Sequence, residues 1–392
     1  MTAQIDVVIL GGGIAGLWLL DILRRTGIEA LILNKAALGQ GQTIASQGII
    51  HGGAKYTFGM GLETAVSDLA HMPDCWRASL SGRQGPDLTQ VPPLAETMGM
   101  WVPPQPGGKL LSAFSKKIMR SRMREVHPKN RPVILPTDNT GTYFKLDEMV
   151  IDVPGVLNSL RKRHKDRIRQ IPDDAQLEAR LDPAGTVEIG LGETTIRAQR
   201  VVLTAGAGNE TLLARFGLRH IACQRRPLHQ IMIRGMADPI YLHCVGRSSK
   251  PLATITAHPD PAGGYVWYVG GLLAEEGVSQ SSELLIKTAK SELTRLLPGA
   301  DFRLAKWATH RVERAEPGSG GSRPKSALAT ARESIIVGWP TKLALAPVLA
   351  EKILALQQDD GLTLGLTDLT DLPEWPTPMV AQAPWEVVTS WN

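Results

Sequence analysis

The chain has 392 residues, of which 43% are hydrophobic and 21% charged, a balance typical of a folded protein rather than a disordered or fibrous one. This length exceeds one ordinary hydrophobic core and predicts two domains with a cleft between them. The net charge of +5 is mild, so it suits acidic small molecules or membrane headgroups at least as well as nucleic acid.

The cysteines and the apolar stretches bear on the compartment. Cys75, Cys223 and Cys244 are scattered and odd in number, which argues against a disulfide framework, a zinc site or a cluster and favours the reducing cytoplasm. The N-terminus lacks a signal-peptide pattern, and no apolar stretch reaches the roughly 18 residues that span a bilayer. We expect a cytoplasmic monomer without a transmembrane segment, with peripheral membrane contact left open.

The chain begins with a predicted strand at 5–10, a helix at 14–26 that ends before Gly27, and a second strand at 30–33. Residues 86–106 are rich in Pro and Gly and predict a surface loop. Further helices are predicted at 62–80, 155–167, 210–216, 280–297 and 343–356. Further strands are predicted at 186–191, 195–203, within 227–269, and at 302–312 and 334–337.

This order predicts an α/β protein. Its first domain is Rossmann-like with a parallel central sheet, and its second is built on a large mixed, mostly antiparallel sheet with helices. The dinucleotide-binding domain is discontinuous, at 1–85, 140–220 and 325–370. The substrate domain takes 86–139 and 221–324, and 371–392 form a C-terminal tail that wraps over the surface.

Gly11, Gly13 and Gly16 form a GxGxxG pattern between the first strand and the first helix. Glycines there permit a tight turn, close approach of the backbone to a pyrophosphate, and close helix packing, and the helix N-terminus supplies partial positive charge. The second strand ends in Asn34 and Lys35, where an acidic residue ordinarily holds the adenosine ribose. Without the acidic residue there is no carboxylate to repel the 2′-phosphate of NADP. Asn34 and Lys35 on their own are therefore also compatible with an NADP-dependent enzyme.

Four segments resemble the superfamily of FAD-dependent oxidoreductases that contains D-amino-acid oxidase, glycine oxidase and glycerol-3-phosphate dehydrogenase. They are SQGIIHGGAKY at 46–56, VVLTAGAGNETL at 201–212, AKWATHRVE at 305–313 and IIVGWPTKLALAPVLAEKIL at 335–354. They occur in the family's order, so the resemblance covers most of the chain. It implies non-covalently bound FAD rather than NADP.

The resemblance and the glycine pattern together give the expected cofactor-binding residues. Lys342 and Leu343 open a helix whose N-terminus would face the flavin pyrimidine, where negative charge develops on reduction. The complete set is Gly11, Gly13, Ile14, Ala15, Gly16, Asn34, Lys35, Ser46, Gln47, Gly48, Ile49, Ala205, Gly206, Gly338, Thr341, Lys342 and Leu343.

The resemblance also implies catalytic residues. Arg311 matches the arginine that grips the substrate carboxylate in glycine oxidase-like enzymes, while Lys55 and Tyr56 match an Arg-Tyr pair in the substrate pocket of glycerol-3-phosphate dehydrogenase. Lys342 is a further candidate anion anchor. His51 is a candidate base near the flavin, and His229 a candidate on the substrate side, each with a structural role as the alternative.

These residues predict hydride transfer to flavin N5 from a small anionic amine, amino acid, hydroxy acid or phosphorylated alcohol. The electron acceptor is left open between oxygen, a quinone and a protein, and neither a metal nor nucleic acid is expected. The alternative is a flavoprotein that serves as an electron-transfer or regulatory partner without turnover of its own.

Overall fold

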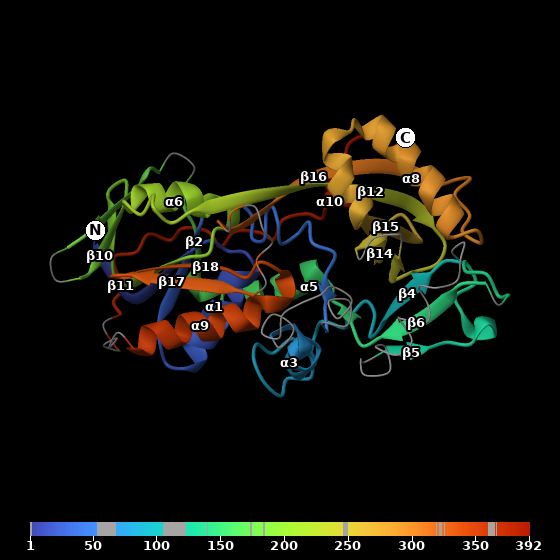
Figure 1. The fold of residues 1–392 in the computed structure, drawn as a ribbon. Coiled ribbons are helices and arrows are strands. Elements are labelled where there is room, and N and C mark those ends of the chain that lie inside the picture. Colours follow the sequence, from blue (N-terminus) through green and yellow to red (C-terminus); the bar gives the residue numbers. More distant parts are fainter. Residues whose placement is uncertain are drawn as a thin grey trace.

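The computed structural model describes residues 2–52, 68–104, 123–138, 140–172, 175–182, 185–245, 250–318, 320, 324, 326–359, 365 and 367–392. Within these residues the strands form two eight-stranded sheets and one two-stranded sheet (Figure 1).

The first sheet has a parallel centre of five strands in the order β18, β11, β1, β2, β8. Its strands are apolar and buried on both faces, as parallel sheets covered by helices require. β17, β10 and β9 add antiparallel pairs at its margins. The bounds are β1 Thr2–Leu10, β2 Ala30–Asn34, β8 Ile168–Gln170, β9 Leu177–Leu181, β10 Val187–Leu191, β11 Thr194–Leu203, β17 Leu328–Arg332 and β18 Ile335–Trp339.

One face of this sheet is covered by α1 (Ile14–Arg25), α5 (Val153–Arg163) and α9 (Ala346–Asp359), which share one apolar core with α3 (Met72–Leu80). Trp18 and Trp76 join α1 to α3, with ring centroids 4.6 Å apart. The other face packs against α6 (Asn209–Arg215) and against Leu369, Leu372 and Trp375 near the start of the C-terminal tail. Both faces of the sheet are therefore covered.

The second sheet has the order β16, β12, β15, β14, β13, β4, β6, β5 and is antiparallel except where β13 runs parallel to β4. β12 and β16 are long strands that reach from the side of α6 to α8 (Figure 1). The bounds are β4 Met98–Val102, β5 Met123–Glu125, β6 Thr142–Leu146, β12 Cys223–Met236, β13 Leu242–Val245, β14 Pro251–Pro259, β15 Tyr265–Gly270 and β16 Lys306–Pro317.

The two faces of the second sheet differ in chemistry. Alternate residues such as Ile231, Ile233 and Trp267 form an apolar core with α8 (Ser282–Leu296), beside α7 (Leu272–Glu276) and η5 (Gly277–Ser279). The opposite face carries polar side chains such as Gln230 and Thr254 beside an apolar cluster that includes Met232 and Val266, and Gln47 hydrogen-bonds to its strands. The remaining short elements are β3 Ile49–Ile50, β7 Met149–Val150, η2 Pro128–Asn130, η3 Lys165–Arg167, η4 Gly206–Gly208, η6 Leu343–Leu345 and α10 Pro384–Val387.

This architecture confirms the predicted fold class, and two details correct the sequence analysis. Residues 86–106 are not all loop, because β4 lies within them and pairs with β6 and β13. β6 itself belongs to the second sheet, although its residues fall in the range assigned to the first domain. Long-range strand pairing decides both cases, and a Pro- and Gly-rich local composition cannot reveal it.

The C-terminal tail ties the two sheets together. Just before it, Asp368 forms a backbone bridge with Gln4 beside the first sheet, and within the tail Met379 O accepts the Leu38 N–H at 2.8 Å. Farther along, Trp385 packs on the second sheet, and Asn392 exchanges two backbone hydrogen bonds of 2.8 Å with Trp307. The tail is therefore a clamp across both sheets.

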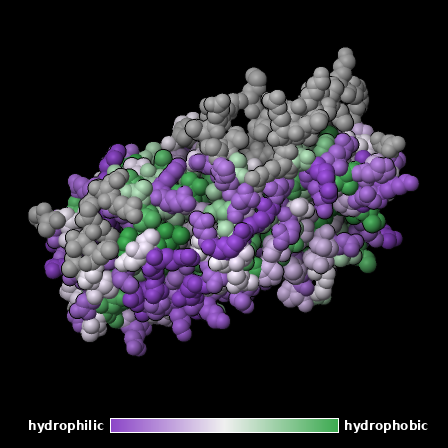
Figure 2. Space-filling view, turned by 90° about the horizontal axis from the view of Figure 1, so that it is seen from below, coloured by the Kyte–Doolittle hydropathy of each residue, from purple (hydrophilic) through white to green (hydrophobic). Residues whose placement is uncertain are grey.

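The surface shows mixed character. On the face in Figure 2 the described residues are mostly hydrophilic, with apolar residues in small groups between them. A few large apolar side chains, such as Val133 and Leu304, are exposed among the described residues, which is ordinary for a folded protein. Among the described residues, no helix combines the length and hydropathy needed to cross a membrane.

Candidate functional site

The glycine loop after β1 is tightly packed. A Cβ on Gly16 would lie 2.0 Å from Gly11 O, and a Cβ on Gly11 would lie 2.6 Å from the Ala205 backbone. Gly11 also has φ +118°, and Thr204 Oγ1 donates to its carbonyl at 3.0 Å. Only glycine fits these places, and the loop leads straight into Ile14 and Ala15 at the start of α1, as a pyrophosphate cradle requires.

Asn34 at the end of β2 braces this loop. Its Oδ1 accepts the Gly12 N–H at 2.8 Å, and its Nδ2 donates to Ala36 O at 2.6 Å. Lys35 beside it is exposed. The asparagine therefore uses its side chain to shape the cradle from within, a task that an amide can perform with both its donor and its acceptor.

The Ser46–Ile49 segment joins the cradle to the second sheet. Gln47 Nε2 donates to Thr254 O at 2.8 Å and to Tyr268 O at 2.9 Å, and the Tyr268 hydroxyl donates to Ala45 O at 3.1 Å. Gly48 has φ +68°. Ser46 Oγ is buried and has no hydrogen-bond partner among the described residues, so this segment offers a polar atom to a bound group.

The fourth segment closes the cradle. Thr341 turns the chain with φ 59°, Lys342 is the N-cap residue of η6, and η6 packs against β3. The backbone N–H groups that open η6 and α9 therefore lie next to the Ser46–Ile49 segment. Gly206 opens η4 beside β16, and Gly338 in β18 packs tightly on α9. The described parts of three segments that resemble the FAD family, 46–52, 201–212 and 335–354, thus lie together beside the glycine loop, and their glycines and the buried Ser46 hydroxyl fit a dinucleotide.

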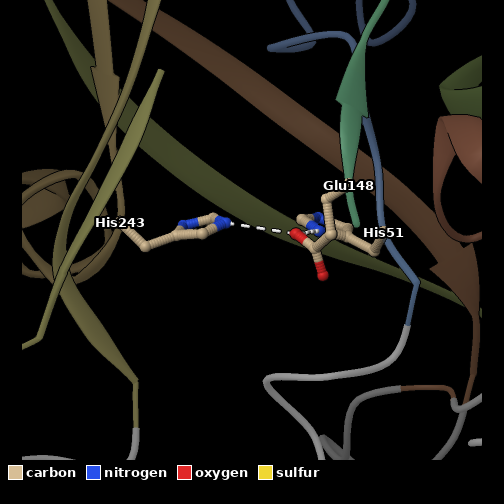
Figure 3. A group of neighbouring side chains, drawn as sticks. All are labelled: His51, Glu148 and His243. Carbon is tan, nitrogen blue, oxygen red and sulfur yellow. Dashed lines mark hydrogen bonds and ion pairs between the residues drawn. The ribbon is translucent and has the colours of Figure 1, made fainter. Parts of the chain in front are cut away.

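Beside β3 lies a cluster of three titratable side chains (Figure 3). His51 Nδ1 is 3.1 Å from Glu148 Oε2, and His243 Nε2 is 3.3 Å from the same oxygen. Glu148 and His243 are buried, while the side chain of His51 is 15% exposed. One accessible imidazole is thus backed by a buried carboxylate, a pairing that can hold a proton or a metal ion.

His229 and Arg311 lie on the other face of the second sheet. They are cross-strand partners in β12 and β16, so their side chains share a face. His229 is buried, with Nδ1 3.0 Å from Gly277 O and Nε2 2.9 Å from Thr309 Oγ1, and burial lowers its pKa. The Arg311 Nη atoms donate to Val278 O and Gln280 O at 2.9 and 2.7 Å. The structure does not bring these two residues to the cradle.

The neighbouring pair, Gln230 and His310, faces the first domain instead. Gln230 Oε1 lies 2.6 Å from the Tyr268 hydroxyl oxygen, so it shares the single hydroxyl proton with Ala45 O. Desolvation lowers the pKa of His310. The sequence analysis did not single out Gln230, because nothing local tells which of two adjacent strand residues faces the first sheet.

Glu148 and His243 were also missed, and Lys55 and Tyr56 lie outside the described residues. Glu148 immediately precedes the apolar run at 149–151, and this position is the sequence feature that could have indicated its burial. His243 sits in a short strand with no motif around it. Only the pairing of β13 with β14 and the approach of the β6–β7 corner bring these residues together.

A parallel sheet with a glycine cradle at the carboxyl ends of its strands, facing a second, mostly antiparallel sheet, is the architecture of a dinucleotide-dependent enzyme. Comparison with known proteins identifies its family. Residues 6–328 match the family model DAO, FAD dependent oxidoreductase. The probable FAD-dependent oxidoreductase PA4991 of Pseudomonas aeruginosa is 42% identical over 386 residues, which cover 97% of each chain.

Solved structures agree. The crystal structure of PA4991 aligns with a TM-score of 0.83 and 38% identity over 99% of each chain. Glycine oxidase from Geobacillus kaustophilus has a TM-score of 0.68 at 15% identity, covering 94% of this chain and 98% of that one. L-alpha-glycerophosphate oxidase from Mycoplasma pneumoniae, with FAD bound, has a TM-score of 0.68 at 13% identity, covering 97% and 99%. The last two likenesses show the fold.

The chain belongs to the DAO family of FAD-dependent oxidoreductases. The predicted superfamily, the FAD cofactor and the enzyme class are thereby confirmed, and the NADP alternative falls. The individual site residues stay predictions.

Proposed function

We propose that this enzyme oxidises a small anionic amine, amino acid, hydroxy acid or phosphorylated alcohol by hydride transfer to N5 of a non-covalently bound flavin. The observation that supports it most is the accessible His51 imidazole, backed by the buried Glu148 carboxylate at 3.1 Å and placed next to the Ser46–Ile49 segment. Oxidation of an alcohol or amine releases a proton as well as a hydride, and an imidazole can accept that proton near neutral pH.

The flavin, when bound, would act as the two-electron acceptor. The residues of the chain bind the cofactor and the substrate and accept the substrate proton. The glycine loop, braced by Asn34, holds the pyrophosphate. The N–H groups that open η6 and α9 lie beside β3 and favour negative charge there. His51, assisted by Tyr56, takes the substrate proton.

We assign the substrate anion to Lys342 and Lys55. Lys342 precedes η6, next to β3, where a cation would sit beside both the cofactor and the substrate. Arg311 and His229 are left out of this proposal because they lie on the far sheet face, where backbone carbonyls and Thr309 engage their polar nitrogens. A Lys342→Met variant should raise the KM for the anionic substrate about tenfold or more, whereas Arg311→Met should leave KM unchanged.

The test is anaerobic reduction of the holoenzyme. The yellow protein is mixed with a panel of amines, amino acids, hydroxy acids and phosphorylated alcohols while the visible flavin absorbance is followed. Bleaching by one anionic compound, with stoichiometric release of its two-electron oxidised product, supports the proposal. Bleaching only by uncharged compounds contradicts the anionic substrate class.

A protein that retains FAD, is reduced by dithionite, and yet resists every compound would favour the alternative of an electron-transfer or regulatory flavoprotein. Co-purification with a single protein partner would strengthen that alternative.

A further inference from the structure

The His51, Glu148 and His243 cluster shows a gradient of burial. The Glu148 side chain is fully buried, His243 is 1% exposed and His51 is 15% exposed. Both histidine contacts meet at a single carboxylate oxygen, Oε2 of Glu148 (Figure 3). Only His51 is therefore accessible to a small molecule, and the other two residues lie behind it.

The fold sets this geometry through two strand pairings. Ile49 pairs with Val150 and Ile50 with Met149, so the next position in the same register brings His51 opposite Glu148. On the second sheet His243 is the cross-strand partner of Thr254, whose Oγ1 lies 2.9 Å from His243 Nδ1. The cluster therefore depends on both sheets at once.

Thr254 connects the cluster to the Ser46–Ile49 segment. The carbonyl of Thr254 accepts the hydrogen bond from Gln47, while its hydroxyl contacts His243. The chain of contacts thus runs from Gln47 through Thr254 and His243 to Glu148 and His51. A displacement of Glu148 or His243 would therefore move both the Ser46–Ile49 segment and the His51 imidazole.

The contacts lead to one assignment of the protons when Glu148 is ionised. An ionised carboxylate only accepts hydrogen bonds, so the nitrogens that face Oε2 are then the protonated ones, Nδ1 of His51 and Nε2 of His243. The Thr254 hydroxyl then donates to His243 Nδ1. In His51 this tautomer puts the basic lone pair on Nε2, at the opposite side of the ring from Glu148.

We propose that Glu148 and His243 are positioning residues that hold His51 in the Nδ1–H tautomer, so that its Nε2 accepts the proton of the substrate. This inference rests on the proposed function. The bound flavin would take the hydrogen of the C–H bond together with its electron pair, and the substrate O–H or N–H proton would pass to His51 Nε2. A C=O or C=N bond forms, the substrate is oxidised by two electrons, and Glu148 stabilises the resulting imidazolium.

Charged groups on the neighbouring elements complete the setting. Asp147, next to Glu148, forms an ion pair with Arg77 of α3, and Lys342 precedes η6. The phenol of Tyr241, which packs near β3, has its pKa raised to about 12 by burial and stays neutral at the pH values used below. Among the described residues, the Glu148 carboxylate contacts the His51 ring directly, at 3.1 Å.

The test uses the holoenzyme with ¹⁵N-labelled histidines, with and without substrate. Ring-nitrogen chemical shifts should show His51 as the Nδ1–H tautomer, and Glu148→Gln should lower the midpoint of its titration by about one pH unit or more. Flavin reduction by the identified substrate should slow on the order of 100-fold in Glu148→Gln with little change in KM. His243→Gln, which keeps a donor, should show a smaller change in the same direction.

His258→Gln is the matched control, because His258 is a buried histidine of the same sheet that contacts Thr256 and not Glu148. It should leave the His51 titration unchanged. An unchanged His51 tautomer and midpoint in Glu148→Gln would overturn the proposal, whether or not any substrate is found. A stoichiometric transition metal in the purified protein, lost in both His51→Gln and His243→Gln, would also overturn it by making the cluster a metal site.

Discussion

Trp385 of the C-terminal tail stacks on His258 of the second sheet, with ring centroids 4.2 Å apart and planes inclined by 28°. Trp385 also meets the ring of Tyr268 edge-on, with centroids 5.5 Å apart. Because the Tyr268 hydroxyl contacts Ala45 O, only the Tyr268 side chain separates this anchor of the tail from the residue that precedes the Ser46–Ile49 segment. The tail therefore supports the sheet face that meets the cofactor domain.

Replacing this anchor should destabilise the protein. Trp385 is 5% exposed, and truncation of a buried Trp to Ala costs about 3–5 kcal/mol. Trp391 lies under Arg234 at 4.3 Å but is only half-buried, so Trp391→Ala is the matched control and should cost about 1 kcal/mol. Urea unfolding of both variants measures the difference, and equal midpoints would contradict the clamp.

Acidification should weaken the fold through His258. Burial lowers its pKa to about 3 from the ordinary 6.5. Between these values the unfolded chain binds a proton that the folded protein does not, so the free energy of unfolding falls as the pH falls below 6.5. Above pH 6.5, His258 is neutral in both the folded and the unfolded chain, and it causes no loss of stability there.

The measurement is urea unfolding at a series of pH values from 7 to 4.5. His258→Gln should reduce the slope by up to about 1.4 kcal/mol per pH unit, the value for one proton. The exposed His220 provides the control variant, His220→Gln. An identical slope in the wild type and His258→Gln would refute the assignment.

Asn34 should contribute to FAD affinity by shaping the loop. Asn34→Ala removes the acceptor of the Gly12 N–H and the donor to Ala36 O, and we expect the Kd for FAD to rise about tenfold. Fluorescence quenching during titration of the apoprotein with FAD gives the Kd. Gln170→Ala is the control, because its amide makes only a 3.5 Å contact with Lys35 O. Equal Kd values for the two variants would show that the brace is dispensable.

Gly16 should tolerate no side chain. A Cβ 2.0 Å from the Gly11 carbonyl must displace the turn, so Gly16→Ala should lose the yellow colour on purification and unfold at a lower temperature. Gly190→Ala in β10 is the control, since its added Cβ would make an ordinary contact of 3.5 Å with Glu178. Full retention of FAD in Gly16→Ala would contradict the tight packing of the loop.

The sequence by itself determined the parts of the protein that depend on local order. The strand, glycine loop and helix at residues 5–26 need a fixed spacing of glycines between apolar runs, and the structure has them as β1, the loop and α1. The helix that opens at Leu343 and the segment that contains Gln47 were likewise visible as short motifs. Such signals are local because the backbone approaches the cofactor within a few residues.

Tertiary structure alone decided which side chains meet. Arg311 and His310 are adjacent, and only the pairing of β16 with β12 places His310 rather than Arg311 on the face toward the first domain. Glu148, His51 and His243 come from three distant segments, so no motif could unite them. Strand alternation and register place such residues, and both are fixed by long-range hydrophobic burial rather than by the neighbouring sequence.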